Sequence, residues 1–217
     1  MQFLLYAVFI LSGAAGLIYE SIWSRYLGLF VGHSAYAQII VLTIFLGGMS
    51  LGAWLTGKRS DRLSEPLILY AFLELAIGAI GLVFHDIFLW TTAVSYDSIF
   101  PMLAGSPVAL TVVKWTIASL LILPQSVLLG TTFPLMSAGV LRLVRNEPGR
   151  VLSLLYFANS LGASAGVLFA GFYLLRAAGL EGTLLAAAVL NGVVFLVPLS
   201  AVRLSPFFAH TDSAPVP

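Results

Sequence analysis

Long apolar runs separated by short polar breaks dominate the chain. A helix that spans a bilayer needs roughly 20 mostly apolar residues, and six runs of about this length follow one another. Charged residues, Pro and Gly cluster between the runs. The predicted membrane spans are 3–24, 35–56, 67–90, 108–132, 151–175 and 182–202. The fourth run can also extend to Leu141, as a long or kinked helix around Pro124 and Pro134.

Composition favours the same architecture. Of the 217 residues, 60% are hydrophobic and 9% are charged, whereas a soluble domain usually carries about a quarter charged residues. Such a chain cannot cover its surface with polar groups, so the bilayer must solvate most of it. The sequence therefore predicts an all-α, polytopic membrane bundle of six helices over 1–204, followed by a short polar tail over 205–217 that is disordered and cytoplasmic.

Basic residues are divided unequally between the two ends of such a bundle. Six spans place both termini, the second loop and the fourth loop on one side. That side carries seven basic residues: Lys58, Arg59, Arg62, Arg142, Arg145, Arg150 and Arg203. The opposite side carries three: Arg25, Lys114 and Arg176. Because cytoplasmic loops are enriched in Lys and Arg, both termini are expected in the cytoplasm, with the chain in a bacterial inner membrane.

Several charged residues fall inside the predicted spans, toward the extracytoplasmic side. A charge at the centre of a spanning helix costs about 2.5–3.5 kcal/mol on insertion scales, so it normally finds a partner. Ion pairs or helix ends that reach water would account for Arg25 and Arg176. Glu20 and Lys114 lie deeper in their runs. A pair between these two residues, joining the first and fourth spans, is the hypothesis for them.

Glu74 stands alone among charges in the inner half of the bundle. Three side chains and the basic loop are its candidate partners; the side chains are those of Gln125, Asn159 and Asn191. A lone intramembrane carboxylate is the usual place for a proton- or cation-linked step, and a fully hydrogen-bonded carboxylic acid is the alternative. Asn159 shares a helix face with Tyr156, Gly162 and Gly166, which suits close helix packing or the lining of a cavity.

Small residues recur at four-residue spacing in three places. They are Gly28 and Gly32, Gly48 and Gly52, and Gly162, Gly166 and Ala170. Such stripes let helix backbones approach closely in lipid. Packing within the chain is the expectation for all three, and an oligomer interface on one of them is the alternative.

Motifs of soluble chemistry are missing from the sequence. It contains no cysteine, and His33, His85 and His210 have no metal-ligand spacing with one another. No phosphate-binding loop, dinucleotide fingerprint, nucleophile elbow or zinc-protease motif is present. The sequence is therefore expected to have no catalytic site, cofactor, metal or nucleic-acid partner, and not to be an enzyme.

Four segments resemble the membrane region of the fused major-facilitator/spermidine-synthase-like proteins. They are "SGAAGLIYESIWSRYLGLFVGHSAYA" (12–37), "FLGGMSLGAWLTGKRSD" (45–61), "LLGTTFPLMSAGVLR" (128–142) and "GRVLSLLYFANSLGASAGVLFAGFYLLRAAGLEGTL" (149–184). In that family a helix bundle precedes a cytoplasmic domain that resembles polyamine aminopropyltransferases. The sequence ends at Pro217, about where that domain begins in fused members, so a stand-alone membrane half or one with a separate soluble partner is expected.

The segment "GKRSDR" resembles the start of the major-facilitator loop between helices two and three, without its following glycine and basic pair. The resemblance implies a charge latch formed by Gly57, Asp61 and Arg62 at the membrane surface. A basic loop with an incidental Asp explains the same residues. The bundle would then resemble half of a major-facilitator transporter.

Two functions remain open at this point. One is a membrane subunit or anchor, with the bilayer and a protein partner or second copy as its contacts, that docks a soluble enzyme or joins a larger complex. The other is a transporter half that works as a dimer on a small solute, cationic or polyamine-like. The candidate residues for an intramembrane charge network or a substrate pathway are Glu20, Arg25, Glu74, Lys114, Asn159 and Arg176.

Overall fold

A computed structural model describes residues 2–60, 62–144 and 147–209 of the chain. It consists of helices in nearly all of these residues, and the described part contains no strand, which confirms the all-α prediction. The α-helices are α1 (Gln2–Val31), α2 (Ser34–Ser60), α3 (Pro66–Val94), α4 (Phe100–Met102), α5 (Pro107–Leu143), α6 (Pro148–Phe169) and α7 (Leu175–Ala209). Two π-helical segments, η1 (Ser95–Ile99) and η2 (Ala170–Leu174), continue α3 and α6.

Proline marks the start of three helices. Pro66, Pro107 and Pro148 each occupy the first turn, where the missing backbone N–H would have no helical partner in any case. The hydroxyl of Ser106 caps α5 by accepting from the N–H of Ala109 at 3.4 Å. These local signals start α3, α5 and α6 at 66, 107 and 148, close to the predicted starts at 67, 108 and 151.

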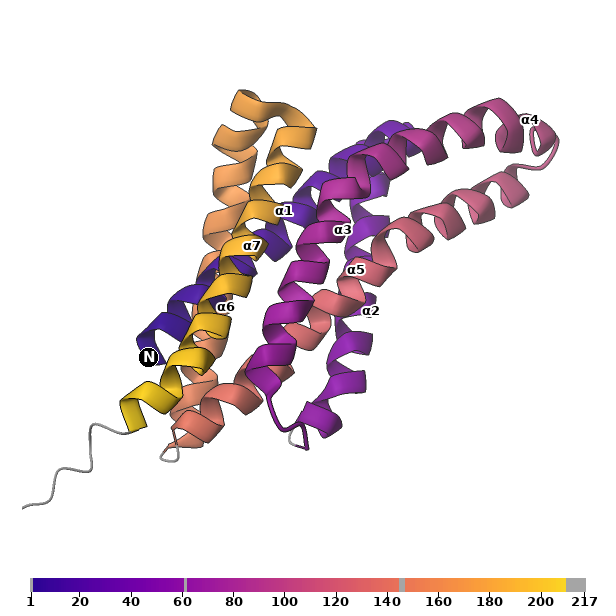
Figure 1. The fold of residues 1–217 in the computed structure, drawn as a ribbon. Helices are drawn as coiled ribbons and strands as arrows, with labels where there is room; N and C mark the ends of the chain where they lie inside the picture. The colour runs from indigo at the N-terminus through magenta and orange to yellow at the C-terminus, as the bar shows by residue number, and fades with distance from the viewer. Residues whose placement is uncertain (1, 61, 145–146, 210–217) are drawn as a thin grey trace, which may run out of the picture.

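Five helical segments in the described residues are long and apolar enough to cross a membrane. They are Phe3–Val31, Ser34–Ser60, Pro66–Met102, Pro107–Leu143 and Pro148–Leu199. The fifth has 52 residues and includes one non-helical residue, Gly179, with φ 69° and ψ −167°. The chain reverses its direction there (Figure 1). The six separate spans of the sequence analysis are therefore not found, because the expected break at 176–181 is reduced to a single glycine.

Two other expected breaks are largely helical. α1 continues to Val31, where Gly32 follows with φ 84°, and α3 continues through η1 and α4 to Met102. Tertiary contacts hold these extensions: Phe30 packs on Phe100 with ring centroids 5.5 Å apart, and the Tyr96 hydroxyl donates to the Phe30 carbonyl at 2.8 Å. These contacts join residues far apart in the chain, so the local sequence does not predict them.

The remaining helix boundaries agree with the sequence analysis only in part. α5 is one continuous helix through Pro124 and Pro134, as the longer alternative predicts. α7 reaches Ala209 and so takes in the first residues of the segment expected to be a disordered tail. The rest of that tail, 210–217, lies outside the described residues.

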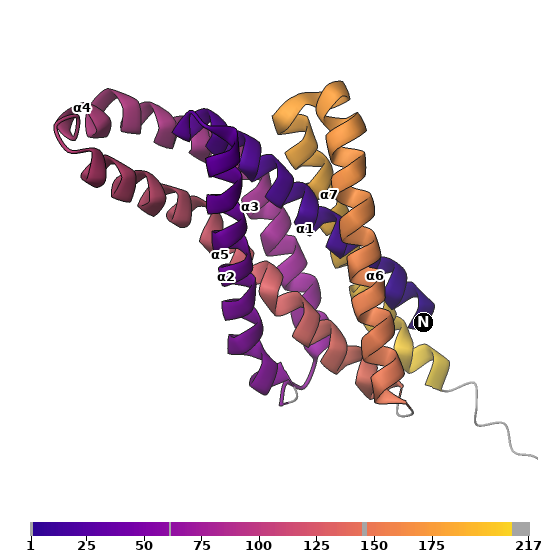
Figure 2. The ribbon, with the colours of Figure 1, turned by 180° about the vertical axis from the view of Figure 1, so that it is seen from behind.

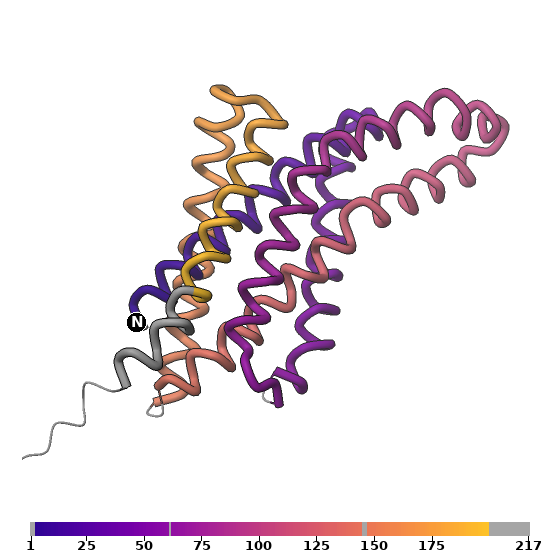
Figure 3. The backbone as a smooth tube through the Cα atoms, viewed as in Figure 1, coloured from indigo at the N-terminus to yellow at the C-terminus, as the bar shows by residue number. Residues whose placement is uncertain are grey.

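α1 is the central helix of the bundle. It contacts α2, α6 and α7, while α3 packs on α5 and α7, and α2 packs on α5. Figure 2 shows α1 running obliquely between α2 and α6. The start of α1, the end of α2, the start of α3, the end of α5, the start of α6 and the end of α7 share one end of the bundle, the lower end in Figure 1. The end of α3, η1, α4 and the start of α5 form an arm that projects sideways from the other end (Figure 3).

Glycines permit the closest helix contacts. Gly52 of α2 faces the backbone of α5, and Gly162 of α6 faces the backbone of α1. A side chain at either position would overlap a backbone carbonyl. The neighbouring Gly166 also faces the backbone of α1, and Gly48 faces the side chain of Ser126 in α5. These two pairs confirm the expected packing within the chain, whereas Gly32 faces open space and serves to end α1.

Large apolar side chains cover the outside of the bundle. Trp54, Trp90, Leu120 and Phe172 are each more than two thirds exposed. Water does not favour so many exposed apolar groups, whereas hydrocarbon does. Together with the five candidate spans, this surface is that of a membrane protein.

Candidate functional site

Glu74 of α3 lies at the centre of a buried hydrogen-bond network. The Ser12 hydroxyl of α1 donates to its Oε1 at 2.5 Å, and Nδ2 of Asn191 in α7 donates to its Oε2 at 2.5 Å. The Tyr19 hydroxyl of α1 donates to Oδ1 of Asn191 at 2.8 Å. All four side chains are buried, with at most 3% exposed. The network ties α1, α3 and α7 together where no competing solvent group is available.

The structure selects one of the three side chains proposed as partners of Glu74. Asn191 contacts it directly. Gln125 donates instead to the backbone carbonyl of Ile77, at 3.0 Å. Asn159 lines a cavity beside α1. The idea of Glu74 as an isolated charge is thus replaced by a carboxyl group with two hydrogen-bond donors.

Ser12 and Tyr19 were missed in the sequence analysis. They are seven residues apart, so they share a face of α1, and this spacing of polar groups is the signal that was available. Which helix covers that face is a tertiary property. The Tyr70 hydroxyl, which is also buried, lies beside Ser12 and Glu74 without a hydrogen-bond partner of good geometry.

A first cavity of about 360 Å³ opens beside α1, between α2, α5 and α6. We call it the lower chamber. Its polar lining consists of Ser12, Thr132, Tyr156 and Asn159, and the remaining lining is apolar or glycine. Ser12 therefore belongs both to the wall of the lower chamber and to the network of Glu74.

A second cavity of about 550 Å³ lies further along α1, toward the end with the Gly179 turn. We call it the upper chamber. Its lining is Glu20, Ser21, Ser24, Arg25, Gly28 and Leu29 of α1, Ser34 and Gln38 of α2, and Val167 of α6. The α1 residues of the two chambers form one row at four-residue spacing, and residues of α2 and α6 line both chambers. We call this row the α1 groove.

Glu20 and Lys114 do not form the expected pair. Glu20 is 9% exposed, and no basic side chain among the described residues lies within 4 Å of its carboxylate. The ammonium group of Lys114 lies instead 5.1 Å from the ring centroid of Phe100, a cation–π contact. The pairing hypothesis is wrong because the arm carries Lys114 toward α4 and away from the α1 groove.

The other predicted site residues are dispersed. Arg25 is exposed and lines the upper chamber, and Arg176 is exposed in the first turn of α7. Of the predicted latch, Gly57 faces open space, Arg62 is exposed, and Asp61 lies outside the described residues. The latch remains a prediction.

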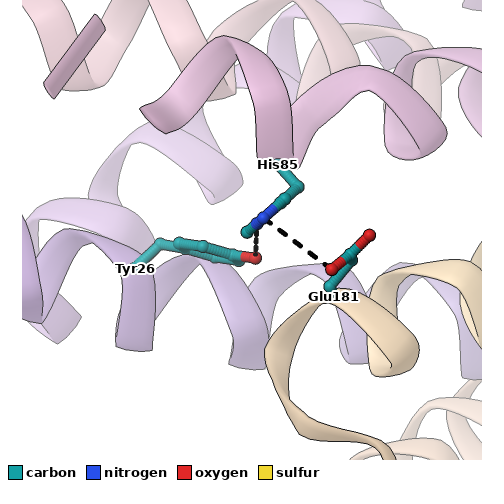
Figure 4. Close-up of polar contacts among 3 residues, drawn as sticks. All are labelled: Tyr26, His85 and Glu181. Carbon is teal, nitrogen blue, oxygen red and sulfur yellow. Dashed lines mark hydrogen bonds and ion pairs between the residues drawn. The ribbon is translucent and has the colours of Figure 1, made fainter. Parts of the chain in front are cut away.

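A further polar cluster joins α1, α3 and α7 near the upper chamber's end of the bundle (Figure 4). The Tyr26 hydroxyl lies 2.7 Å from Nδ1 of His85, and Nε2 of His85 lies 3.8 Å from a carboxylate oxygen of Glu181. When Nδ1 accepts the Tyr26 proton, Nε2 carries the hydrogen that faces Glu181. Glu181 is mostly exposed, so this cluster lies at the rim of the bundle, where it can stabilise the turn at Gly179.

The described residues contain no group of three or more His, Cys, Asp or Glu side chains that could hold a metal ion. The polar groups instead form two chambers and one buried network inside an apolar shell. The fold is thus a helical bundle with five segments long and apolar enough to cross a membrane, and two partly polar chambers lie along its central helix.

A search among known proteins gives one informative likeness. The chain is 31% identical over 196 residues to polyamine aminopropyltransferase 2 of Streptomyces coelicolor (strain ATCC BAA-471 / A3(2) / M145). The alignment takes in 89% of this chain and 33% of that protein, so the chain spans about a third of its relative's length. No protein-family profile matches the chain, and no solved structure matches it. The likeness supports a distant link to the polyamine synthases and leaves the major-facilitator part of the resemblance untested.

The expectation that the protein is not an enzyme is contradicted by this likeness, because the relative is named for an enzymatic activity. The error came from treating the absence of short soluble motifs as evidence about catalysis. A helical membrane segment carries few such motifs whatever the activity of the protein to which it is related.

Proposed function

We propose that this bundle is the membrane part of a polyamine aminopropyltransferase-type system, which holds the aminopropyltransferase at the bilayer. The observation that carries the proposal is the alignment itself: 89% of an apolar helical chain corresponds to one third of a protein named for that activity. The enzyme would be docked as a neighbouring domain or a separate polypeptide. The exposed apolar surface supports contacts with lipid and with a partner chain.

Cell fractionation tests this proposal. Aminopropyltransferase activity is measured in membrane and soluble fractions of cells that make the chain and of cells that lack it. We expect membrane-bound activity only when the chain is present. Activity that is equally soluble in both cells would count against anchoring. The Gly47→Ala variant is the matched control, since Gly47 faces open space and the change should leave the distribution as it is.

We also propose that the end of the bundle that holds the start of α1 and the end of α7 faces the cytoplasm of a bacterium, in its inner membrane. The basic side chains of Lys58, Arg59, Arg62, Arg142 and Arg150 support this orientation. The chain has no cysteine, so single cysteines at Gly57 and Gly105 give a clean test with a membrane-impermeant maleimide in intact cells. We expect labelling at 105 alone, and labelling at 57 alone would reverse the orientation.

A second candidate function is solute transport, and the α1 groove is the observation that favours it. Two chambers follow one another along the central helix. If the helices before and after the turn at Gly179 each cross the bilayer, the bundle has the six crossings of half a major-facilitator transporter. A dimer would then enclose the groove. Uptake of a labelled diamine into proteoliposomes tests this candidate, and the absence of flux above empty liposomes would exclude it.

A further inference from the structure

Glu20 has the features of a binding residue rather than of a structural one. It is 91% buried, it lies within the span Phe3–Val31, and it lines the upper chamber. No basic side chain of the described residues is within 4 Å of its carboxylate. An acidic side chain at membrane depth is expensive to keep unless it meets a cation or donor. The upper chamber is the open space from which such a group can reach it.

The rest of the upper chamber supplies neutral acceptors. Ser21 and Ser24 come from α1, and Ser34 and Gln38 come from α2. The Ser24 hydroxyl donates to the Glu20 backbone carbonyl at 3.1 Å, which leaves its oxygen lone pairs available. An ammonium group carries three N–H donors and no acceptor. One carboxylate surrounded by hydroxyl and amide oxygens is the chemistry that satisfies it.

Arg25 adds a positive charge to the chamber. Its side chain is exposed and lines the same chamber. A guanidinium at this position suits an anionic or polar end of the ligand. Gly28, near the end of α1, also lines the chamber, so the chamber reaches the last turns of this candidate span.

We propose that the upper chamber binds a primary ammonium group, with Glu20 as its anionic partner. The ammonium can belong to a free amine or to the ethanolamine headgroup of a lipid, whose phosphate would lie toward Arg25. The inference does not depend on anchoring of an enzyme. Binding of an amine does not require its transport across the membrane. The binding test and the transport test can therefore give opposite results.

The experiment uses the purified chain in nanodiscs of phosphatidylcholine, whose headgroup has no primary amine. Putrescine is titrated by calorimetry in one arm. In the other arm, the nanodiscs contain equal amounts of phosphatidylethanolamine and phosphatidylcholine, and native mass spectrometry compares how much of each lipid the protein retains. We expect Glu20→Gln to weaken the binding of at least one probe by about 10- to 100-fold, the value of a charge-assisted hydrogen bond.

Asp97→Asn is the matched control, because Asp97 is an exposed carboxylate at the same end that does not line the chamber. We expect it to bind as the wild type does. Gln38→Leu, a change at an exposed residue of α2, should weaken binding about fivefold and serves if Glu20→Gln does not fold.

Each outcome decides the matter. Glu20-dependent binding of putrescine identifies a soluble amine, and a Glu20-dependent preference for phosphatidylethanolamine identifies the headgroup. If the intact protein binds neither probe, or if Glu20→Gln binds as the wild type does, the proposal is refuted. If Glu20→Gln does not fold, unchanged binding by Gln38→Leu refutes it.

Discussion

Replacing Asn191 by alanine tests the buried network most directly. Its amide donates to Glu74 at 2.5 Å and accepts from the Tyr19 hydroxyl at 2.8 Å. The side chain is fully buried. The substitution therefore removes one donor and one acceptor at once, and it leaves two buried groups on α1 and α3 without their partner.

The magnitude follows from the number of bonds. Interhelical hydrogen bonds in membrane proteins contribute about 0.6 kcal/mol on average and at most about 1.7 kcal/mol. Asn191→Ala breaks two of them, so it should lower the free energy of unfolding by about 1–3 kcal/mol. Ser12→Ala and Tyr19→Phe each break one and should cost about half as much. The double variant Tyr19→Phe/Asn191→Ala should cost less than the sum, because the two residues share a bond.

The assay is reversible unfolding by SDS in mixed micelles, followed by far-ultraviolet circular dichroism. Asn159→Ala is the matched control: the chemical change is the same, but Asn159 lines the lower chamber and has no hydrogen bond from its side chain to the described residues. We expect it to be close to wild type. If Asn191→Ala costs no more than Asn159→Ala, or less than Ser12→Ala, the reasoning about the network is wrong.

Three further predictions concern packing and the upper rim. Gly130→Ala should lower the free energy of unfolding by about 1–3 kcal/mol, because the added methyl group overlaps the facing backbone of α2. Gly47 faces open space, so Gly47→Ala should leave that free energy unchanged in the same assay. Gly179→Ala should cost about 1–3 kcal/mol, since φ 69° with ψ −167° is a conformation that only glycine adopts without strain; an unchanged thermal midpoint would contradict this. Tyr26→Phe should lower the free energy of unfolding by about 1 kcal/mol, because it loses the hydrogen bond to the His85 imidazole. Glu181→Gln should change stability little, because the Glu181 side chain is 75% exposed. A larger effect of Glu181→Gln than of Tyr26→Phe would contradict this order.

Hydrophobic periodicity and the helix-start signals could be read without the structure. The apolar runs, the prolines at the starts of α3, α5 and α6, and the long α5 are all local properties of the chain. The ends of helices were less accessible. Where α1 and α3 continue past the expected break, distant contacts such as that between Tyr96 and Phe30 hold the helix. The sequence predicts a break at 176–181, but it does not show that a single glycine with φ 69° makes the turn.

The candidate site divides in the same way. The sequence alone places Glu20, Glu74 and Asn159 inside long apolar runs, and it predicts partners for them because a bilayer makes an isolated charge or amide costly. Only the tertiary structure decided the partners. Pairing between helices depends on how each helix is rotated and which neighbour covers each face, and neither is encoded in the spacing of polar residues along one helix. For that reason the structure joins Glu74 to Asn191 and Ser12, turns Lys114 toward Phe100, and leaves Glu20 in an open chamber.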